Sequence, residues 1–233
     1  RVSSAFMNDA KNHQFSGLVT VFHERRLPEA ATPVGYAALI DAYALKVPLP
    51  YTLCAVATRH KTLEADGWHL FTPRHAPSPT LEGHLTFALK YEGLDLAVLK
   101  QLFVKTGPDP VAALVRAQPT GSYARRIWFL YEWLLGTPLP LPDLKKGTYV
   151  EALDPDLQWA GEPSNSSRHR IRNNLPGTPA FCPLVRRTTT LAEFAALNLA
   201  DRAKTIAADV PADLLARTAA FLLLKDSRAS YVI

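Results

Sequence analysis

The strongest constraint on the fold is a helical pattern near the end of the chain, in residues 211–233. Pro211 stands where a helix can begin without losing a hydrogen bond, and Asp213 places a negative charge in the first turn. Long side chains then recur at three- and four-residue spacing, at Leu214, Leu215, Thr218, Phe221, Leu222 and Lys225. The run 219–224 is apolar nearly all round, which predicts a helix buried within a helical body. After a short polar stretch the sequence ends on three apolar residues, 231–233, so we expect further chain beyond Ile233.

Composition places the chain among ordinary globular proteins. Of its 233 residues, 48% are hydrophobic and 20% charged, and the length is sufficient to bury a core. No apolar run approaches the roughly 18–20 residues that span a bilayer, and the first residues lack a signal peptide's apolar segment. The two cysteines, Cys54 and Cys182, lie far apart, which argues against a disulfide framework or a zinc site. We therefore expect a cytoplasmic protein with no membrane partner.

The pattern of helices and prolines predicts three parts. Residues 1–32 form an N-terminal extension or linker with a short strand at 17–22; residues 1–6, before the only methionine, are expected to be vector-derived or left after processing. Residues 33–78 predict a helix capped by Thr32, a proline stop, a second helix over 51–60 and a strand or turn at 68–71. That order is the outline of a helix-turn-helix or winged-helix unit. Two packed helices without a nucleic-acid role are the alternative, which we favour.

The third part, residues 79–233, predicts a helical body that ends in the helix over 211–233. Helices are expected over 80–91, 94–105, 110–117, 122–135 and 191–209, with Thr80 and Thr190 as caps. A strand at 147–153 is expected to pair with 168–172. The fold class predicted is mainly α, a multi-helix body with a minor β component near 17–22, 68–71 and 147–172.

No catalytic motif occurs in the sequence. His60, His69, His75 and His84 form the densest histidine region, but no pair has the spacing of metal ligands. The cysteines sit among apolar neighbours and are expected to be buried and inert. The glycine-rich loops that cradle phosphates and the elbow that exposes a catalytic serine are also missing from the sequence. We expect no catalytic residue, no metal ligand and no bound cofactor in this chain.

One charge pattern could bind a ligand. In an extended segment, Arg168, Arg170 and Arg172 would project to one face, because strand side chains alternate. They would form an anion or nucleic-acid patch, or pair within the chain with the nearby carboxylates of Glu151, Asp154 and Asp156. We favour pairing within the chain. Arg125 and Arg126 are expected to be surface pairs. A net charge of +5 permits a polyanionic partner without requiring one.

Residues 225–233, KDSRASYVI, resemble the start of the inhibitory helix of Fic-domain proteins, which often contains S-x-x-S-x-x-I-E-G. Ser227, Ser230 and Ile233 match that spacing, with Ser230 at the family's Ser/Thr position. The glutamate that follows in the family would be the next residue. Residues 71–100, 121–136, 168–185 and 214–233 are similar to the N-terminal extensions of a subset of bacterial Fic proteins. The catalytic motif H-P-F-x-x-G-N-G-R occurs nowhere in the chain.

The resemblance implies the N-terminal regulatory and partner-binding region of a Fic-type protein adenylyltransferase. In the family, the inhibitory glutamate pairs with an arginine of the catalytic motif and blocks productive binding of ATP. The intact protein would transfer AMP from ATP, with Mg, to a hydroxyl of a target protein (AMPylation). The partners implied are a Fic core and a target protein, and a homo-oligomer remains open. A nucleic-acid-binding regulatory module and a helical protein-interaction scaffold are the alternatives.

Overall fold

The computed structural model describes residues 14–208 and 210–231. Contacts within the chain divide it into two units, Arg1–Arg186 and Arg187–Ile233. The boundaries predicted at 32/33 and 78/79 both fall inside the first unit. No helix in the described residues has the length and apolarity to cross a membrane.

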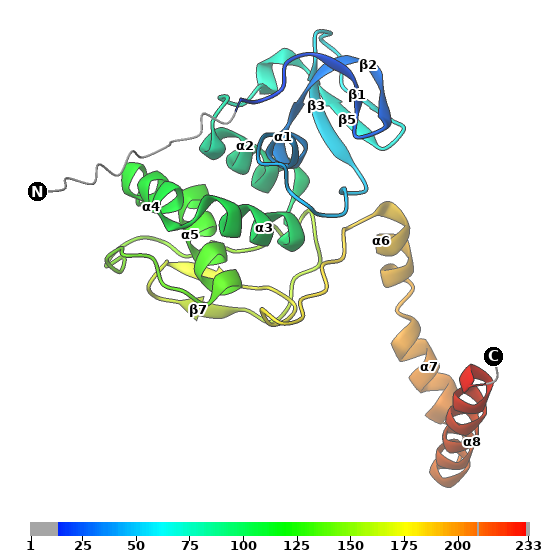
Figure 1. Ribbon diagram of the computed structural model, residues 1–233. Coiled ribbons are helices and arrows are strands. Elements are labelled where there is room, and N and C mark those ends of the chain that lie inside the picture. Colours follow the sequence, from blue (N-terminus) through cyan, green and yellow to red (C-terminus); the bar gives the residue numbers. More distant parts are fainter. Residues whose placement is uncertain (1–13, 209, 232–233) are drawn as a thin grey trace, which may run out of the picture. The chain divides into compact units, whose positions relative to one another are not determined.

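A five-stranded mixed sheet forms one part of the first unit (Figure 1). Its strands are β1 (Val19–Phe22), β2 (Arg25–Val34), β3 (Leu53–Ala57), β4 (Leu63–Ala65) and β5 (Trp68–Phe71), in the spatial order β1-β2-β3-β5-β4. β3 and β5 run parallel, whereas the other neighbours are antiparallel. Two tight hairpins connect strands, through His23–Glu24 and through Asp66–Gly67. All four of these turn residues have positive φ, as type I′ turns require.

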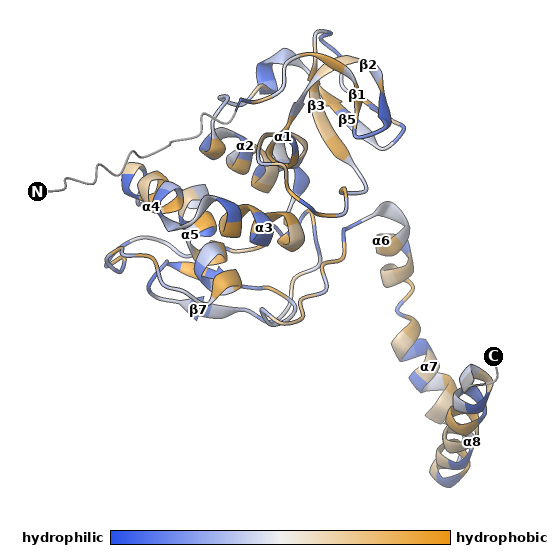
Figure 2. Cartoon of the chain, viewed as in Figure 1, coloured by the Kyte–Doolittle hydropathy of each residue, from blue (hydrophilic) through white to orange (hydrophobic). Residues whose placement is uncertain are grey.

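The predicted second helix, over 51–60, is wrong. Leu53–Ala57 form β3, which lies inside the sheet between β2 and β5 and is buried at every residue. Figure 2 shows the hydrophobic residues along this strand. A strand buried on both faces is apolar throughout, so its pattern does not differ from that of a short buried helix. Since this segment is a strand, residues 33–78 do not form a helix-turn-helix pair.

The helices of the first unit lie between this sheet and a second, smaller one (Figure 1). They are α1 (Gly35–Ala42), α2 (Leu81–Phe87), α3 (Leu96–Thr106), α4 (Pro108–Ala117) and α5 (Ser122–Leu135), with a 3₁₀ turn, η1 (Pro73–His75), and a π-helical turn, η2 (Ala88–Glu92). The prediction of a helix capped by Thr80 is confirmed, because its side chain accepts a hydrogen bond from the Gly83 N–H. α5 ends at Leu135, the last residue of the helix predicted over 122–135, and Gly136 follows in the left-handed conformation.

The smaller sheet packs against α5. It consists of β6 (Val150–Glu151), β7 (Ser164–Ser166) and β8 (Ile171–Asn173), in the order β6-β8-β7. Arg125 and Arg126 of α5 were expected at the surface, but both are buried. Their guanidinium groups donate to backbone carbonyls, Arg125 to Thr148 and Arg126 to Ala152, and so fix this sheet to the helix.

The second unit contains α6 (Thr189–Ala196), α7 (Leu199–Ala208) and α8 (Ala212–Tyr231). The single helix predicted over 191–209 is interrupted at Asn198, which has a φ of 48°. The prediction that the last helix is buried within a helical body is also wrong for the described residues. The apolar side chains of α8 from Leu214 to Leu224 are exposed.

The fold class predicted from the sequence is therefore incorrect. The protein is an α/β fold, with 44% helix, 17% strand and two mixed sheets, rather than mainly α with a minor β component. Strands at 19–22 and 68–71 lie where the sequence predicted them, but β2 and β3 were missed. These two strands complete the larger sheet, and Cys54 of β3 lines a cavity beside it.

Candidate functional site

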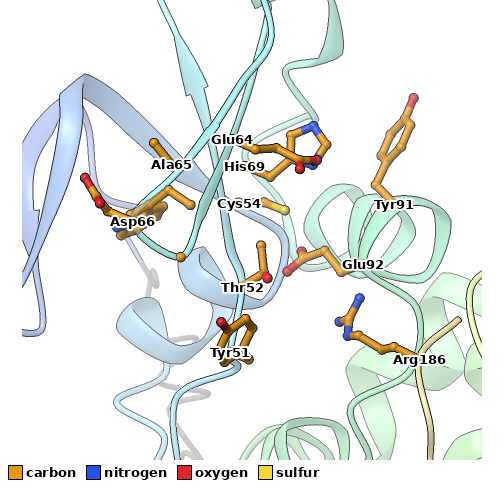
Figure 3. A pocket seen from close by; sticks show the side chains of 12 residues that line it. Tyr51, Thr52, Cys54, Glu64, Ala65, Asp66, His69, Tyr91, Glu92 and Arg186 are labelled. Atoms are coloured by element: carbon orange, nitrogen blue, oxygen red, sulfur yellow. The ribbon is translucent and has the colours of Figure 1, made fainter. Parts of the chain in front are cut away.

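A cavity of about 320 Å³ lies in the first unit, where the larger sheet meets the end of η2. Its walls come from the start of β3, the β4–β5 hairpin, Tyr91 and Glu92 of η2, and Arg186 (Figure 3). The volume is at the lower end of the roughly 300–1,000 Å³ found for small-molecule sites. We call this space the Glu92 cavity.

Glu92 is the most unusual residue of the cavity. Its side chain is 3% exposed, and its Oε1 accepts a hydrogen bond of 2.9 Å from the backbone N–H of Tyr36 in the first turn of α1. α1 has no side-chain cap of its own, so the Glu92 carboxyl group satisfies an otherwise free N–H. Oε2 is buried without a hydrogen-bond partner in the described residues. An unpaired buried acceptor costs about 1–3 kcal/mol.

Burial in this position changes the acidity of Glu92. Desolvation raises the pKa of the carboxyl group to about 8, although the Tyr36 hydrogen bond and the Arg186 charge oppose the rise. The residue terminates a π-helical turn, and Gly93 follows it with a φ of 79°. π-Helical turns occur often at functional sites, because the extra residue redirects side chains from the helix. Here the turn directs Glu92 toward Thr52 and Cys54 (Figure 3).

The other cavity walls carry polar and aromatic groups. His69 Nδ1 lies 3.0 Å from Glu64 Oε1, and the His69 ring stacks on Phe71 with centroids 4.1 Å apart. Desolvation lowers the pKa of His69, against the effect of Glu64. Cys54 is buried, and desolvation raises the pKa of its thiol, so it is not an activated nucleophile. The cavity therefore combines a buried carboxyl group with polar and aromatic walls.

Arg168, Arg170 and Arg172, the candidates for an anion patch, each contact other groups of the chain. Arg168 and Arg170 lie in the turn between β7 and β8, and Arg172 lies in β8. The Arg170 guanidinium donates to the Leu144 and Lys145 carbonyls, and Arg172 Nη1 lies 3.1 Å from Glu151 Oε1. Arg168 pairs with Glu132 and Asp143. Each guanidinium thus has a partner within the chain.

Glu132 of α5 connects this region to the helices. Its carboxylate accepts hydrogen bonds from Trp128, the Leu139 N–H, Arg168 and, at 2.9 Å, His169 Nε2. Burial acts to raise the pKa of Glu132, but the hydrogen bonds from Arg168 and Trp128 hold it below its usual value. Ser166 Oγ lies 2.7 Å from His169 Nδ1, which gives a serine–histidine–glutamate series. Because Arg168 balances the charge of Glu132, this arrangement is a structural connection between α5 and the smaller sheet.

The inhibitory-helix residues predicted from the sequence lie at the end of α8. Ser227 and Ser230 are exposed, and the Ser230 hydroxyl donates to the Asp226 carbonyl at 3.0 Å. Ile233 lies outside the described residues. Leu223, Ser227 and Ser230 follow each other at four- and three-residue spacing and so share one face of the helix. Leu223 is 71% exposed.

The predicted histidine region does not assemble a metal site in the described residues. His69 and His75 lie near Phe71, whereas His84 is buried in α2, where desolvation lowers its pKa to about 4. No group of three or more metal-ligating side chains occurs in this part of the chain. A scan of protein-family models and searches of curated proteins and of solved structures found no match to the chain.

Proposed function

We propose that this chain is the regulatory and partner-binding region of a Fic-type protein adenylyltransferase, and that α8 supplies the contact with the catalytic core. The observation that carries the proposal is the exposed apolar surface of α8. Phe221, Leu222, Leu223 and Leu224 are each at least half exposed. A helix that places four consecutive large apolar side chains in water gains stability by docking on another surface.

The free energy gained by burying the apolar side chains of α8 would be sufficient for regulation. Full burial of a leucine or phenylalanine side chain is worth about 1.5–3 kcal/mol, so two or three such residues offset much of the cost of association. The face that carries Leu223, Ser227 and Ser230 is the one that matches the family's inhibitory pattern. This face is therefore our candidate for the contact near the nucleotide site of a Fic core.

The mechanism that this assignment implies is steric and electrostatic. In the family, the inhibitory helix positions a glutamate against an arginine of the catalytic motif, and ATP then cannot adopt its productive position. The residues described here would hold the helix in place, while the ATP and Mg sites and the attacking hydroxyl belong to the core and the target. The chain by itself would accordingly transfer no AMP.

An assay of AMP transfer tests the proposal. A Fic-type core with the H-P-F-x-x-G-N-G-R motif, from the organism that encodes this chain, is incubated with ATP labelled at the α-phosphate. Added chain should lower the incorporation of AMP into protein. The Leu223→Asp variant should lose this inhibition, because it places a charge on the contact face. Leu214→Asp is the matched control, since Leu214 lies nine residues earlier, on the opposite face of α8, and is also exposed.

Two results would contradict the proposal. One is a rate of AMP incorporation that is independent of the chain's concentration. The other is equal inhibition by the wild type and by Leu223→Asp, which would show that this face of α8 is not the contact.

A further inference from the structure

The Glu92 cavity contains an acidic and a basic side chain that do not pair with each other. Oε2 of Glu92 is buried and has no nitrogen or hydroxyl donor in the described residues; the Cys54 thiol, a weak donor, neighbours its carboxyl group. Arg186 is exposed at the cavity wall, and its charge acts on Glu92 through space. Neither side chain belongs to an ion pair within 4.0 Å among the described residues. In Figure 3 the Arg186 guanidinium points toward the Glu92 carboxyl group, across the cavity from the Glu64–His69 pair.

The two groups require a ligand with both charges. Burial favours the neutral carboxyl group of Glu92 in the free protein. An ammonium group at Oε2 would favour the ionised carboxylate, to which it donates charge-assisted hydrogen bonds. A guanidinium is the preferred partner of a carboxylate group, because its fork matches the two oxygens. A ligand with only one of these charges would leave the second protein group without a partner.

We propose that the Glu92 cavity binds a small zwitterion of the amino-acid type, whose ammonium group donates to Oε2 of Glu92 and whose carboxylate group meets the guanidinium of Arg186. In an α-amino acid one carbon separates the two charged groups, so both reach neighbouring protein groups at once. A cavity of about 320 Å³ is adequate for a ligand of this size.

The surrounding residues allow selection of the ligand's side chain. Thr52 and Cys54 line the cavity beside Glu92, whereas Tyr91 and the Glu64–His69 pair form another wall (Figure 3). Asp66 also lines the cavity, but its carboxylate points away from Glu92 in the same view. The negative charge directed at the ligand's ammonium group therefore comes from Glu92, with Glu64 farther along the wall.

Thermal unfolding of the full chain in the presence of each standard amino acid tests the proposal. At least one amino acid should raise the melting temperature in a saturable manner, because a ligand that binds only the folded state stabilises it. The methyl ester and the N-acetyl derivative of that amino acid each lack one charge. Each should bind at least about ten-fold more weakly, as expected when a buried charge loses its partner.

Variants assign the binding to this cavity. Glu92→Gln keeps an acceptor for the Tyr36 N–H but removes the negative charge, and Arg186→Gln removes the positive charge from an exposed position. Each should weaken binding at least about ten-fold. The controls are Glu162→Gln and Arg26→Gln, which change the same residue types at exposed positions outside the cavity and should bind as the wild type does.

Three results would overturn the inference. The first is no stabilisation by any amino acid. The second is binding by the ester or the N-acetyl derivative as tight as that of the free amino acid, because the ligand would then not be recognised as a zwitterion. The third is undiminished binding by Arg186→Gln, which is exposed and should fold even if Glu92→Gln does not. None of these outcomes depends on whether α8 contacts a catalytic core.

Discussion

Gly35 leaves the space in which the carboxyl group of Glu92 lies. A Cβ atom added to Gly35 would lie 1.6 Å from Oε1 of Glu92, and Gly35 has a φ of +59°, which strains any other residue. The two residues are far apart in sequence but meet where β2 leads into α1. This contact lets Oε1 reach the Tyr36 N–H, so the junction of β2 and α1 depends on both residues.

We expect Gly35→Ala to destabilise the protein strongly. The added methyl group collides with a buried carboxyl group and the backbone must keep a positive φ, which together cost on the order of 3 kcal/mol or more. Urea unfolding measures the change. Gly17→Ala is the control, because no atom lies within 4 Å of the added Cβ there. Equal stability of the two variants would show that Glu92 is not held against Gly35.

The raised pKa of Glu92 makes stability depend on pH. The folded state holds the pKa at about 8, above the value of an exposed glutamate, so the stability contributed by the neutral carboxyl group is complete at low pH and is lost as pH rises to 8. The charged or titratable groups around Glu92 are Tyr36 on α1, Cys54 on β3, Asp95 before α3, and Arg186.

Glu92→Gln removes this titration. The difference in unfolding free energy between wild type and variant should change by on the order of 5 kcal/mol between pH 4 and pH 9, with the wild type losing stability as pH rises. Chemical unfolding at a series of pH values measures it. Parallel pH profiles for the two proteins would mean that Glu92 has an ordinary pKa.

A third prediction concerns Glu132. Glu132→Gln removes the carboxylate that Arg168 and His169 share in a largely buried position, and leaves Arg168 only its more exposed partner Asp143. It should cost on the order of 3 kcal/mol. Glu151→Gln breaks the more exposed pair with Arg172 and should cost less than about 1 kcal/mol. Urea unfolding compares them, and similar costs would contradict the central role of Glu132 in joining α5 to the smaller sheet.

A substitution on the exposed face of α8 should leave the unfolding free energy of the first unit unchanged. Trp68, Trp128, Trp133 and Trp159 all lie in that unit, so tryptophan fluorescence reports its unfolding alone. Leu223→Asp should change the unfolding free energy measured in this way by no more than about 0.5 kcal/mol. A larger loss would show that α8 stabilises the first unit, and would weaken its assignment as a docking element.

Local signals in the sequence predicted several elements correctly, while long-range contacts decided the rest. Thr80 and Gly136 act within one helical turn, so their caps were predictable. Leu53–Ala57 was interpreted as helical because a central strand, buried on both faces, has no alternation. Hydrophobic periodicity correctly indicated that α8 has an apolar surface. Periodicity does not show whether another element of the same chain packs against that surface.

The cavity was not predictable from the sequence for a related reason. Glu92 stands in the sequence as one acidic residue among many, and its role depends on Gly35 and Tyr36, more than fifty residues earlier. The sequence shows glycines at positions 35 and 93, which both have a positive φ in the structure. A glycine in the sequence does not reveal which atom approaches it. Arg125 and Arg126 were predicted to lie at the surface, as most arginines do. They are buried because they donate to backbone carbonyls, and no sequence pattern identifies such partners.

Amide hydrogen exchange of the chain, alone and mixed with the Fic-type core, tests the central claim most directly. If α8 is the docking element, amides of residues 212–231 should exchange more slowly in the mixture, because docking suppresses local opening of the helix. Amides of the larger sheet, in β3 and β5, should exchange as they do in the chain alone. Unchanged exchange in α8 at core concentrations that saturate the AMP-transfer assay would contradict the account.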